Sequence, residues 1–177
     1  DGLHRGHQAM LARLKEEAAH RGLPSCVLTF EPHPREFFSP AQAPARLSSL
    51  REKSELIRAA GIDRLHVCRF NQRFASLSPA EFIERVLIET LGARWILVGD
   101  DFRYGAKRAG DFAYLEETGD RLGFEVESLP TISVENKRAS STAVREALAA
   151  GDMQHARELL GRPYSISGHV MHGNKLG

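Results

Sequence analysis

Apolar residues recur along this chain in two alternating patterns, one with helical spacing and one of short continuous runs. Helical spacing predicts helices near residues 7–20, 49–60 and 112–122, one that begins after Ser78 and Pro79, one from Ser140 or Ser141 to Ala150, and one from Asp152 to Gly161. Apolar runs predict strands at residues 25–30, 64–68, 95–98 and 125–129. Strands separated by helices of this length are typical of an α/β protein, so we expect a doubly wound parallel sheet of Rossmann-like type.

Ligands gather at the carboxyl ends of the strands in such sheets, and three polar segments occupy that position. They are Glu31-Pro32-His33-Pro34 in a predicted loop over 31–44, residues 99–105 in a polar loop over 99–110, and residues 140–145 before a helix. Taken singly, they match a stiff X-Pro loop, an Asp-rich turn and a helix N-cap. Taken together they predict a phosphate and nucleotide pocket, in which Ser141, Thr142 and Arg145 would hold phosphate oxygens.

The first seven residues, Asp1-Gly2-Leu3-His4-Arg5-Gly6-His7, place two imidazoles three positions apart where a helix begins. Positions i and i+3 share a helix face, so His4 and His7 can converge on one phosphoryl group. A helix N-terminus presents unpaired N–H groups to anions, and Gly6 lets the backbone approach closely. The alternative is a pair of surface or metal-binding histidines, which a lone H-x-x-H motif would favour.

The composition argues against some classes of function but does not distinguish one type of enzyme from another. The 177 residues carry a formal net charge of +1, which gives no reason to expect a nucleic-acid partner. No apolar run approaches the ~20 residues of a membrane span and no signal peptide leads the sequence, so we expect a cytoplasmic protein without a membrane partner. Cys26 and Cys68 fall in apolar runs and are expected to be buried reduced thiols, with no metal site. The oligomeric state stays open.

Four motifs together resemble a known family. Asp-Gly-x-His-x-Gly-His, Thr-Phe-Glu-Pro-His-Pro, Val-Gly-x-Asp-Phe-Arg-Tyr-Gly and Ser-Ser-Thr-x-Val-Arg are similar to the bacterial bifunctional riboflavin kinase/FMN adenylyltransferase, or FAD synthetase. The resemblance covers essentially the whole chain, and the H-x-G-H pair alone would indicate only the broader HxGH nucleotidyltransferase superfamily. It implies an FMN adenylyltransferase domain over residues 1–161. Residues 162–177 would then hold a linker and the first strand of a kinase β-barrel.

The resemblance implies adenylyl transfer from ATP to FMN with Mg²⁺, giving FAD and pyrophosphate, and it assigns roles by motif position. His4 and His7 would act on the ATP phosphates, and ATP would also be bound by Asp1, Gly2, Gly6, Asp101, Arg103, Ser141, Thr142 and Arg145. The flavin side would include Phe30, Pro32, His33 and Pro34, with Phe37 and Phe38 as candidate ring contacts. No residue of this chain is assigned as a metal ligand.

The chain also departs from the family pattern. The family's first strand would precede Asp1, so we expect a central strand to be missing; Tyr104 stands where Phe is usual, and Ala139 where Ile is usual. The kinase motif would follow Gly177, so we expect no riboflavin phosphorylation by this chain. Residues 164–170 alternate like a strand, and we expect Gly168 to Gly177 to extend from the body or be disordered.

Two alternatives to an FMN adenylyltransferase remain. One is another HxGH adenylyltransferase, acting on pantetheine phosphate or nicotinate mononucleotide. The Leu-Gly-Arg-Pro-Tyr segment at residues 160–164 and the Phe-Glu-Pro-His-Pro loop argue against it. The other is a non-catalytic nucleotide-binding fragment, which a turnover assay with ATP and FMN would distinguish.

Overall fold

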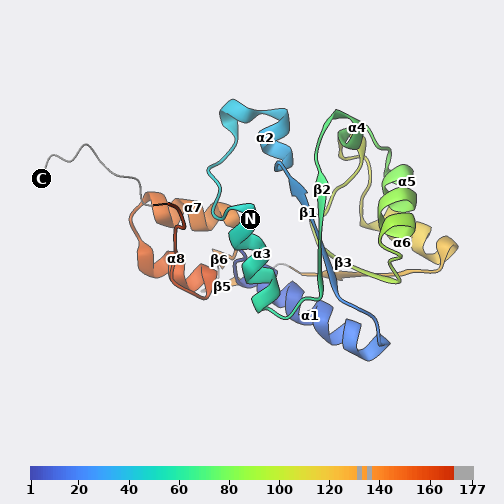
Figure 1. Cartoon of the computed structure of the whole chain (residues 1–177), viewed down its shortest axis with the longest axis horizontal. Helices are drawn as coiled ribbons and strands as arrows, with labels where there is room; N and C mark the ends of the chain where they lie inside the picture. The colour runs from blue at the N-terminus through green and yellow to red at the C-terminus, as the bar shows by residue number, and fades with distance from the viewer. Residues whose placement is uncertain (131–132, 135–136, 170–177) are drawn as a thin grey trace, which may run out of the picture.

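The computed structural model describes residues 1–130, 133–134 and 137–169, in which helices and strands alternate (Figure 1). The first half contains α1 (Arg5–Arg21), β1 (Cys26–Glu31), α2 (Pro34–Phe38), η1 (Pro40–Gln42), α3 (Leu50–Ala59), β2 (Arg64–Arg69) and α4 (Gln72–Ala75). The second half contains α5 (Pro79–Glu81), η2 (Phe82–Thr90), β3 (Trp95–Gly99), η3 (Ala106–Arg108), α6 (Phe112–Leu122), β4 (Glu125–Leu129), β5 (Ser133–Val134), β6 (Lys137–Arg138), α7 (Ser141–Ala149) and α8 (Met153–Leu160).

The predicted α/β class with parallel strands is confirmed. All four predicted strands form, as β1 to β4, and β4 and α6 have the predicted bounds. The cap residues explain the helix starts: Ser49 and Ser78 each form a capping box with the glutamate three positions on. Gly22, Gly123 and Gly161 end α1, α6 and α8 in the left-handed conformation.

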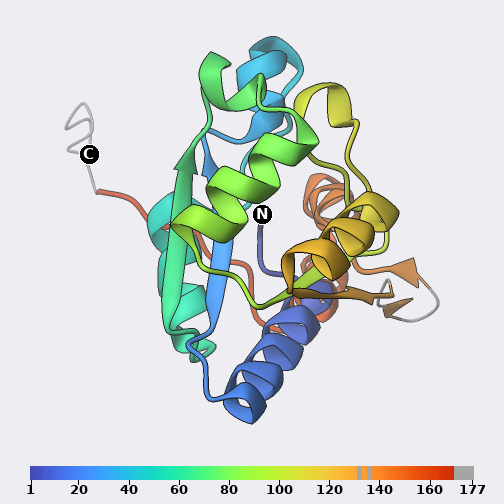
Figure 2. The same cartoon turned by 90° about the vertical axis from the view of Figure 1, so that its right-hand side faces the viewer.

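The predicted doubly wound parallel sheet, in which we expected a central strand to be missing, is found as two separate parallel strand pairs among the described residues. β1 pairs with β2 and β3 pairs with β4, each pair parallel, and no ladder joins β1 to β3 among the described residues. The start of the chain lies between the two strand pairs (Figure 2). Asp1, Leu3 and both facing strands line an apolar cleft of about 450 Å³ there. Among the described residues, no strand bridges the two pairs.

A helical segment holds the two strand pairs together. α5 continues into η2, a π-helical stretch whose apolar face is buried at Ile83 and Leu87. Their core cluster also contains Cys68 of β2 and Val98 of β3, so one hydrophobic core spans both pairs. Burial of this shared core stabilises the two pairs as one body.

The predicted loop over residues 31–44 contains a helix, which corrects the sequence interpretation. His33 is the N-cap of α2: its Nδ1 accepts from the Arg35 N–H at 3.2 Å, and its own N–H donates to Glu36. Pro34 occupies the first helical position, where a missing N–H costs nothing. The prolines therefore start a short helix here instead of only stiffening a loop.

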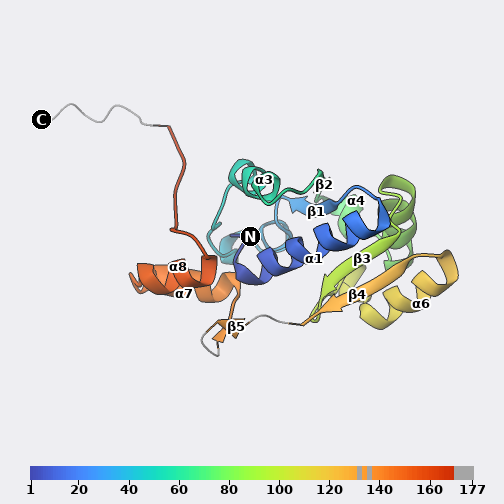
Figure 3. The ribbon, with the colours of Figure 1, turned by 90° about the horizontal axis from the view of Figure 1, so that it is seen from below.

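The end of the described chain forms a separate helical layer beside the start of α1 (Figure 3). α7 is capped by Ser140, packs against α8, and their core includes Val144, Leu159 and Leu160. Residues 163–169 contain no strand, so the predicted strand over 164–170 is not found in its described part. The expectation for Gly168 to Gly177 falls largely on residues 170–177, outside the described residues. Within the described ranges, no helix is both long and apolar enough to span a membrane.

Candidate active site

A tight turn at the start of the chain sets the position of the two predicted catalytic histidines. Gly2 and Leu3 both have positive φ, +77° and +43°. A Cβ at Gly2 would lie 2.8 Å from the Leu47 side chain, so glycine is required there by both conformation and space. The turn delivers His4 to the N-cap of α1, and His4 makes no side-chain cap. The amino end of a 17-residue helix thus starts at the histidine motif.

His4 and His7 converge as the i, i+3 spacing predicts. Their ring centroids are 3.9 Å apart at an interplanar angle of 34°. A Cβ at Gly6 would lie 3.1 Å from the His4 ring, so this glycine makes room for the imidazole itself. The Nδ1 atoms of both rings are buried without a hydrogen-bond partner in the described structure. Buried polar atoms normally have a partner, so these two make the histidine pair a candidate ligand site.

Both imidazoles are neutral at neutral pH. Burial is the main cause, and it lowers the pKa of His4 from 6.5 to about 4 and that of His7 to about 2. The proximity of His4 lowers the pKa of His7 further. A neutral imidazole carries one N–H donor and one acceptor nitrogen, so each ring can donate one directed hydrogen bond. The pair is therefore suited to hydrogen bonding with phosphate oxygens, without adding fixed positive charge.

Asp1 joins the start of the chain to α7. Its carboxylate accepts hydrogen bonds from the Leu47 N–H at 3.0 Å and from Ser48, and forms an ion pair with Arg145 at 2.6 Å. The Ser141 hydroxyl donates to the Asp1 carbonyl at 2.7 Å, and Arg145 Nε donates to the Ala45 carbonyl at 2.7 Å. These contacts join three predicted site residues, Asp1, Ser141 and Arg145, and His4 and His7 follow Asp1 along the same turn and helix. We call this group the histidine end: Asp1, His4, His7, Ser141 and Arg145.

A second set of contacts fixes the same turn from α8, and we call it the α8 latch. Arg162 donates to the Gly2 carbonyl at 2.9 Å and to the Leu3 carbonyl at 3.3 Å. Gln8 donates to the Leu3 carbonyl at 2.9 Å and to the Leu160 carbonyl at 2.7 Å. Arg162 belongs to the segment that the sequence analysis assigned to a linker and the start of a kinase domain. In the structure it supports the turn that positions His4.

The predicted ATP-binding residues of the polar loop lie on exposed parts of the surface. Asp101 pairs with Arg138 at 2.6 Å, and the positive charge of Arg138 contributes to the low pKa of His4 after burial and the chain's amino group. Arg103 instead pairs with Asp111, the N-cap of α6, at 2.9 Å. Asp101 is thus linked toward the histidine end, whereas Arg103 holds the loop to α6. Arg138 was missed because no motif singles it out.

Thr142, also predicted to bind ATP, is exposed in the first turn of α7, next to the bonded Ser141. Its hydroxyl makes no contact with the histidine end in the described structure. The Ser140 hydroxyl accepts from the Ala143 N–H at 3.1 Å and so serves as the N-cap. The alternative interpretation of the Ser-Ser-Thr segment as a helix cap therefore holds for Ser140.

The flavin-side prediction leads to a group of phenylalanines, which we call the aromatic patch: Phe30, Phe37, Phe38, Phe70 and Phe74. Phe70 forms ring contacts with each of the other four, at centroid distances from 5.5 to 5.7 Å. Phe38 is 64% exposed, so the patch opens to solvent. Phe70 and Phe74 were missed, although Phe70 directly follows β2 and the rule on carboxyl strand ends would have found it.

Pro32 and His33 connect this patch to the histidine end. Pro32 follows β1 directly, and His33 is exposed with Nδ1 engaged in capping α2. A small polar pocket lies beside His33, and its lining includes Asp1, Lys53 and Arg145. This pocket is where the flavin-side loop and the histidine end meet.

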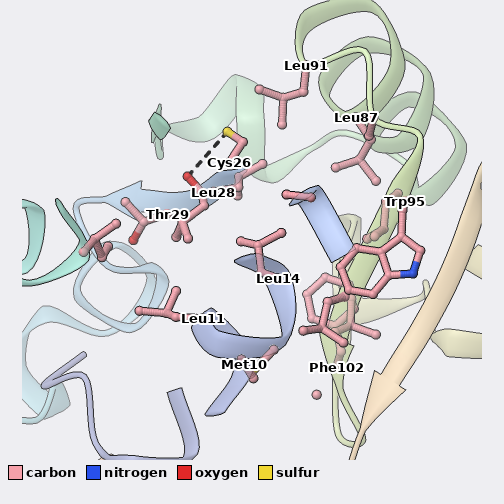
Figure 4. Close-up of a pocket in the computed structure, with 18 of the residues that line it drawn as sticks. Met10, Leu11, Leu14, Cys26, Leu28, Thr29, Leu87, Leu91, Trp95 and Phe102 are labelled. Atoms are coloured by element: carbon pink, nitrogen blue, oxygen red, sulfur yellow. Dashed lines mark hydrogen bonds between the residues drawn. The ribbon is translucent and has the colours of Figure 1, made fainter. Parts of the chain in front are cut away.

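The apolar cleft lies on the other side of this junction. Leu14 of α1 lies between Leu28 of β1 and Trp95 of β3 (Figure 4). The polar residues that line this apolar cleft include His7 and Lys53. Within the described ranges, no three His, Cys, Asp or Glu side chains gather closely enough to hold a metal ion.

Comparisons with known proteins identify the family of this chain. The family model described as FAD synthetase matches residues 1–143. The chain is 52% identical over 176 residues to the bifunctional riboflavin kinase/FMN adenylyltransferase of Pseudomonas fluorescens, covering 99% of this chain and 56% of that protein. The proteins of the same name from Escherichia coli K12 and Haemophilus influenzae are 47% and 46% identical, each over 100% of this chain and over 56% and 58% of their own lengths.

A solved structure described as a macrolide-efflux protein from Streptococcus pneumoniae superimposes with a TM-score of 0.81 at 29% identity, covering 98% of this chain and 58% of that one. The chain spans about half the length of the curated relatives it matches. The matched residues include the histidine end up to Ser141 and the aromatic patch. The chain belongs to the FAD synthetase family.

Proposed function

We propose that this chain is the FMN adenylyltransferase module of a bifunctional riboflavin kinase/FAD synthetase. An oxygen of the FMN phosphate attacks the α-phosphorus of ATP, the new P–O bond gives FAD, and the bond to the leaving pyrophosphate breaks. The reaction needs no protein nucleophile, since both reacting groups belong to the substrates. The protein contributes by positioning two anions and by stabilising charge that moves to the leaving group.

The single observation that carries this proposal is the neutral, partnerless histidine pair at the amino end of α1. His7 lines the cleft and, in this proposal, donates to an α-phosphate oxygen as charge builds there. His4 lies behind it and donates to the neighbouring phosphates. Donors fixed before the reaction stabilise the transition state without reorganising, and this is the largest effect available to such a site.

The remaining ATP assignments follow from the first turn of α7. We propose that Thr142 and the first N–H groups of α7 bind the β- and γ-phosphates, with Arg145 adding positive charge. In the structure Ser141 and Arg145 also hold Asp1, so their contribution includes fixing the turn that carries His4. Asp101 and Arg103 are proposed to border the nucleotide from the loop after β3.

The flavin ring is proposed to lie on the aromatic patch, beside Pro32 and Pro34. Aromatic faces stack on planar ligands and bury large apolar areas. Mg²⁺ is proposed to enter with ATP, coordinated by its phosphates as part of the substrate. We further propose that residues 162–177 join this module to the kinase half, and that the enzyme acts in the cytoplasm.

The test is to incubate the chain with ATP, MgCl₂ and FMN and to separate flavins by chromatography. We expect FAD and pyrophosphate in equal amounts. Replacement of FMN by pantetheine phosphate or nicotinate mononucleotide tests the related adenylyltransferases; faster turnover with either would overturn the FMN assignment. Binding of ATP and FMN without turnover would instead identify a non-catalytic nucleotide-binding module.

A further inference from the structure

Lys53 is a partly buried cation that the proposed mechanism does not use. It lies in the first turns of α3, and its Nζ donates to Thr29 Oγ1 of β1 at 3.5 Å. The same side chain lines both the apolar cleft and the small polar pocket. It therefore stands at the junction of the two cavities, where an anion in either could reach it.

The acidic groups near Lys53 are already occupied. The Glu31 and Glu36 carboxylates both bind the Arg46 guanidinium, at 2.6 Å between Glu31 Oε1 and Nη2 and between Glu36 Oε1 and Nε. Of the ion pairs in the described structure, none includes Lys53, and the 3.5 Å contact with Thr29 is its only hydrogen bond there. Two of the three ammonium N–H donors are thus free for a ligand.

Nearby carboxylates offset the cost of burying this ammonium only in part. Desolvation is the largest effect and lowers the pKa of Lys53, Glu31 and Glu36 raise it, and the positive charge of Arg46 lowers it. A partly buried cation without an ion-pair partner is typical of a site that receives an anionic ligand. The location of Lys53 indicates which anion it would bind.

The candidate ATP contacts come from α7 and from His4 and His7, whereas Lys53 is bonded to Thr29, one residue before Phe30 on the strand that leads to the flavin-side loop. The apolar cleft places Lys53 with His7, and the polar pocket places it with His33. Of the two reacting phosphates, the one that must also reach the flavin-side loop is the one carried by the flavin.

We propose that the Lys53 ammonium binds the phosphate monoester of FMN and holds it beside His7 for attack on ATP. This inference rests on the proposed function and adds a group that recognises the phosphorylated form of the flavin. Lys53 forms no covalent bond in this role. It neutralises part of the phosphate charge and orients the attacking oxygen.

Because riboflavin lacks the phosphate, the ratio of its Kd to that of FMN isolates the contribution of Lys53. Both Kd values can be measured by flavin fluorescence for the wild-type chain, Lys53→Met, Lys53→Arg and the control Lys15→Met, which removes an exposed lysine. In Lys53→Met we expect FMN binding to weaken about ten- to a hundredfold, the range for losing a hydrogen bond to a charged group, with riboflavin binding unchanged. Lys53→Arg should recover part of the preference, and Lys15→Met should match wild type.

Equal weakening of both flavins in Lys53→Met, or an unchanged ratio, would overturn the role of Lys53. If the methionine variant fails a thermal melt, Lys53→Gln takes its place in the same titrations. Steady-state kinetics give a second measure: the KM for FMN should rise in the variant and the KM for ATP should not. A wild-type chain that forms FAD but shows no variant effect rejects this inference alone, whereas a wild-type chain that neither binds FMN nor forms FAD rejects the proposed function and this inference with it.

Discussion

The histidine end and the aromatic patch are built by different interactions. At the histidine end, the single residue Asp1 accepts hydrogen bonds from Leu47, Ser48, Ser141 and Arg145. The α8 latch fixes the turn that follows Asp1. The aromatic patch is held by ring contacts near 5.5 Å, and its outer ring at Phe38 is largely exposed. One region is positioned by directional bonds and the other by packing.

This difference sets what each region can contribute to a reaction. Hydrogen-bond donors must be aimed at the atom on which charge develops, so a small displacement weakens catalysis strongly. Ring stacking tolerates displacement and contributes mainly to affinity. Changes at the histidine end should therefore affect rate, and changes in the aromatic patch should affect flavin binding.

The largest effect is expected from His7→Ala. We predict that kcat for FAD formation falls by at least ~10²-fold, the usual cost of losing one transition-state donor. The fold should persist, because His7 Nδ1 has no partner to lose. Turnover and a thermal melt are measured together, with His20→Ala as the control because its side chain is 81% exposed on the same helix. An unchanged kcat would remove His7 from the mechanism.

A smaller effect is expected from Arg145→Lys. The lysine cannot reproduce the fork that binds both Asp1 and the Ala45 carbonyl, so we predict that ATP binding weakens about tenfold and FMN binding much less. Separate titrations of each ligand check this, with the exposed Arg157→Lys on α8 as the control. Equal weakening of both ligands would point to a general loss of structure.

The aromatic patch provides the contrasting variant. Phe70→Ala removes the ring at the centre of the patch and should weaken FMN and riboflavin alike, by about fivefold, with kcat and ATP binding little changed. Tyr114→Ala, an exposed aromatic on α6, is the control. A drop in kcat larger than the loss of flavin affinity would show that the patch also positions the reacting groups.

The smallest expected effect concerns the change in the free energy of unfolding with pH. The folded-state pKa of His4 is about 4, below its ordinary 6.5, so the unfolded chain binds more protons between these values. The contribution of His4 to the free energy of unfolding is fully present well above pH 6.5. It decreases as the pH falls toward 4, and about 1 kcal/mol of it is lost at pH 6. Urea unfolding at pH 7.5 and pH 6 should show a smaller difference for His4→Gln than for wild type. Identical differences would mean that His4 is not desolvated.

The local elements of this fold were largely predictable. The N-caps at Ser49 and Ser78, the C-terminal Gly123 and the apolar strand runs follow local rules, and the structure confirms them. The helix α2 was missed because histidine is an uncommon cap, although Pro34 and Glu36 are typical of a helix start. The division into two strand pairs does not follow from the local pattern, because strand runs do not say which edges pair, although the family resemblance led us to expect a missing central strand.

The sequence predicted which residues belong to the candidate site better than it predicted which contacts they make. The spacing of His4 and His7 predicted their convergence, and Ser141 and Arg145 were predicted to lie near phosphates. Ser141 and Arg145 both bind Asp1 because α7 packs against residues 45–48, which are far away in the sequence. Lys53 and Arg162 were missed for the same reason: their roles arise from tertiary packing and not from a motif.

The α8 latch ties the segment that follows α8 to the turn that carries His4. Arg162 is the first residue beyond the α/β body, yet its guanidinium is bonded to the backbone that leads into His4. A shift of the segment after Gly161 would therefore act on this turn through a single side chain. An expression boundary drawn at Gly161 would remove this connection, whereas one drawn a few residues later would keep it.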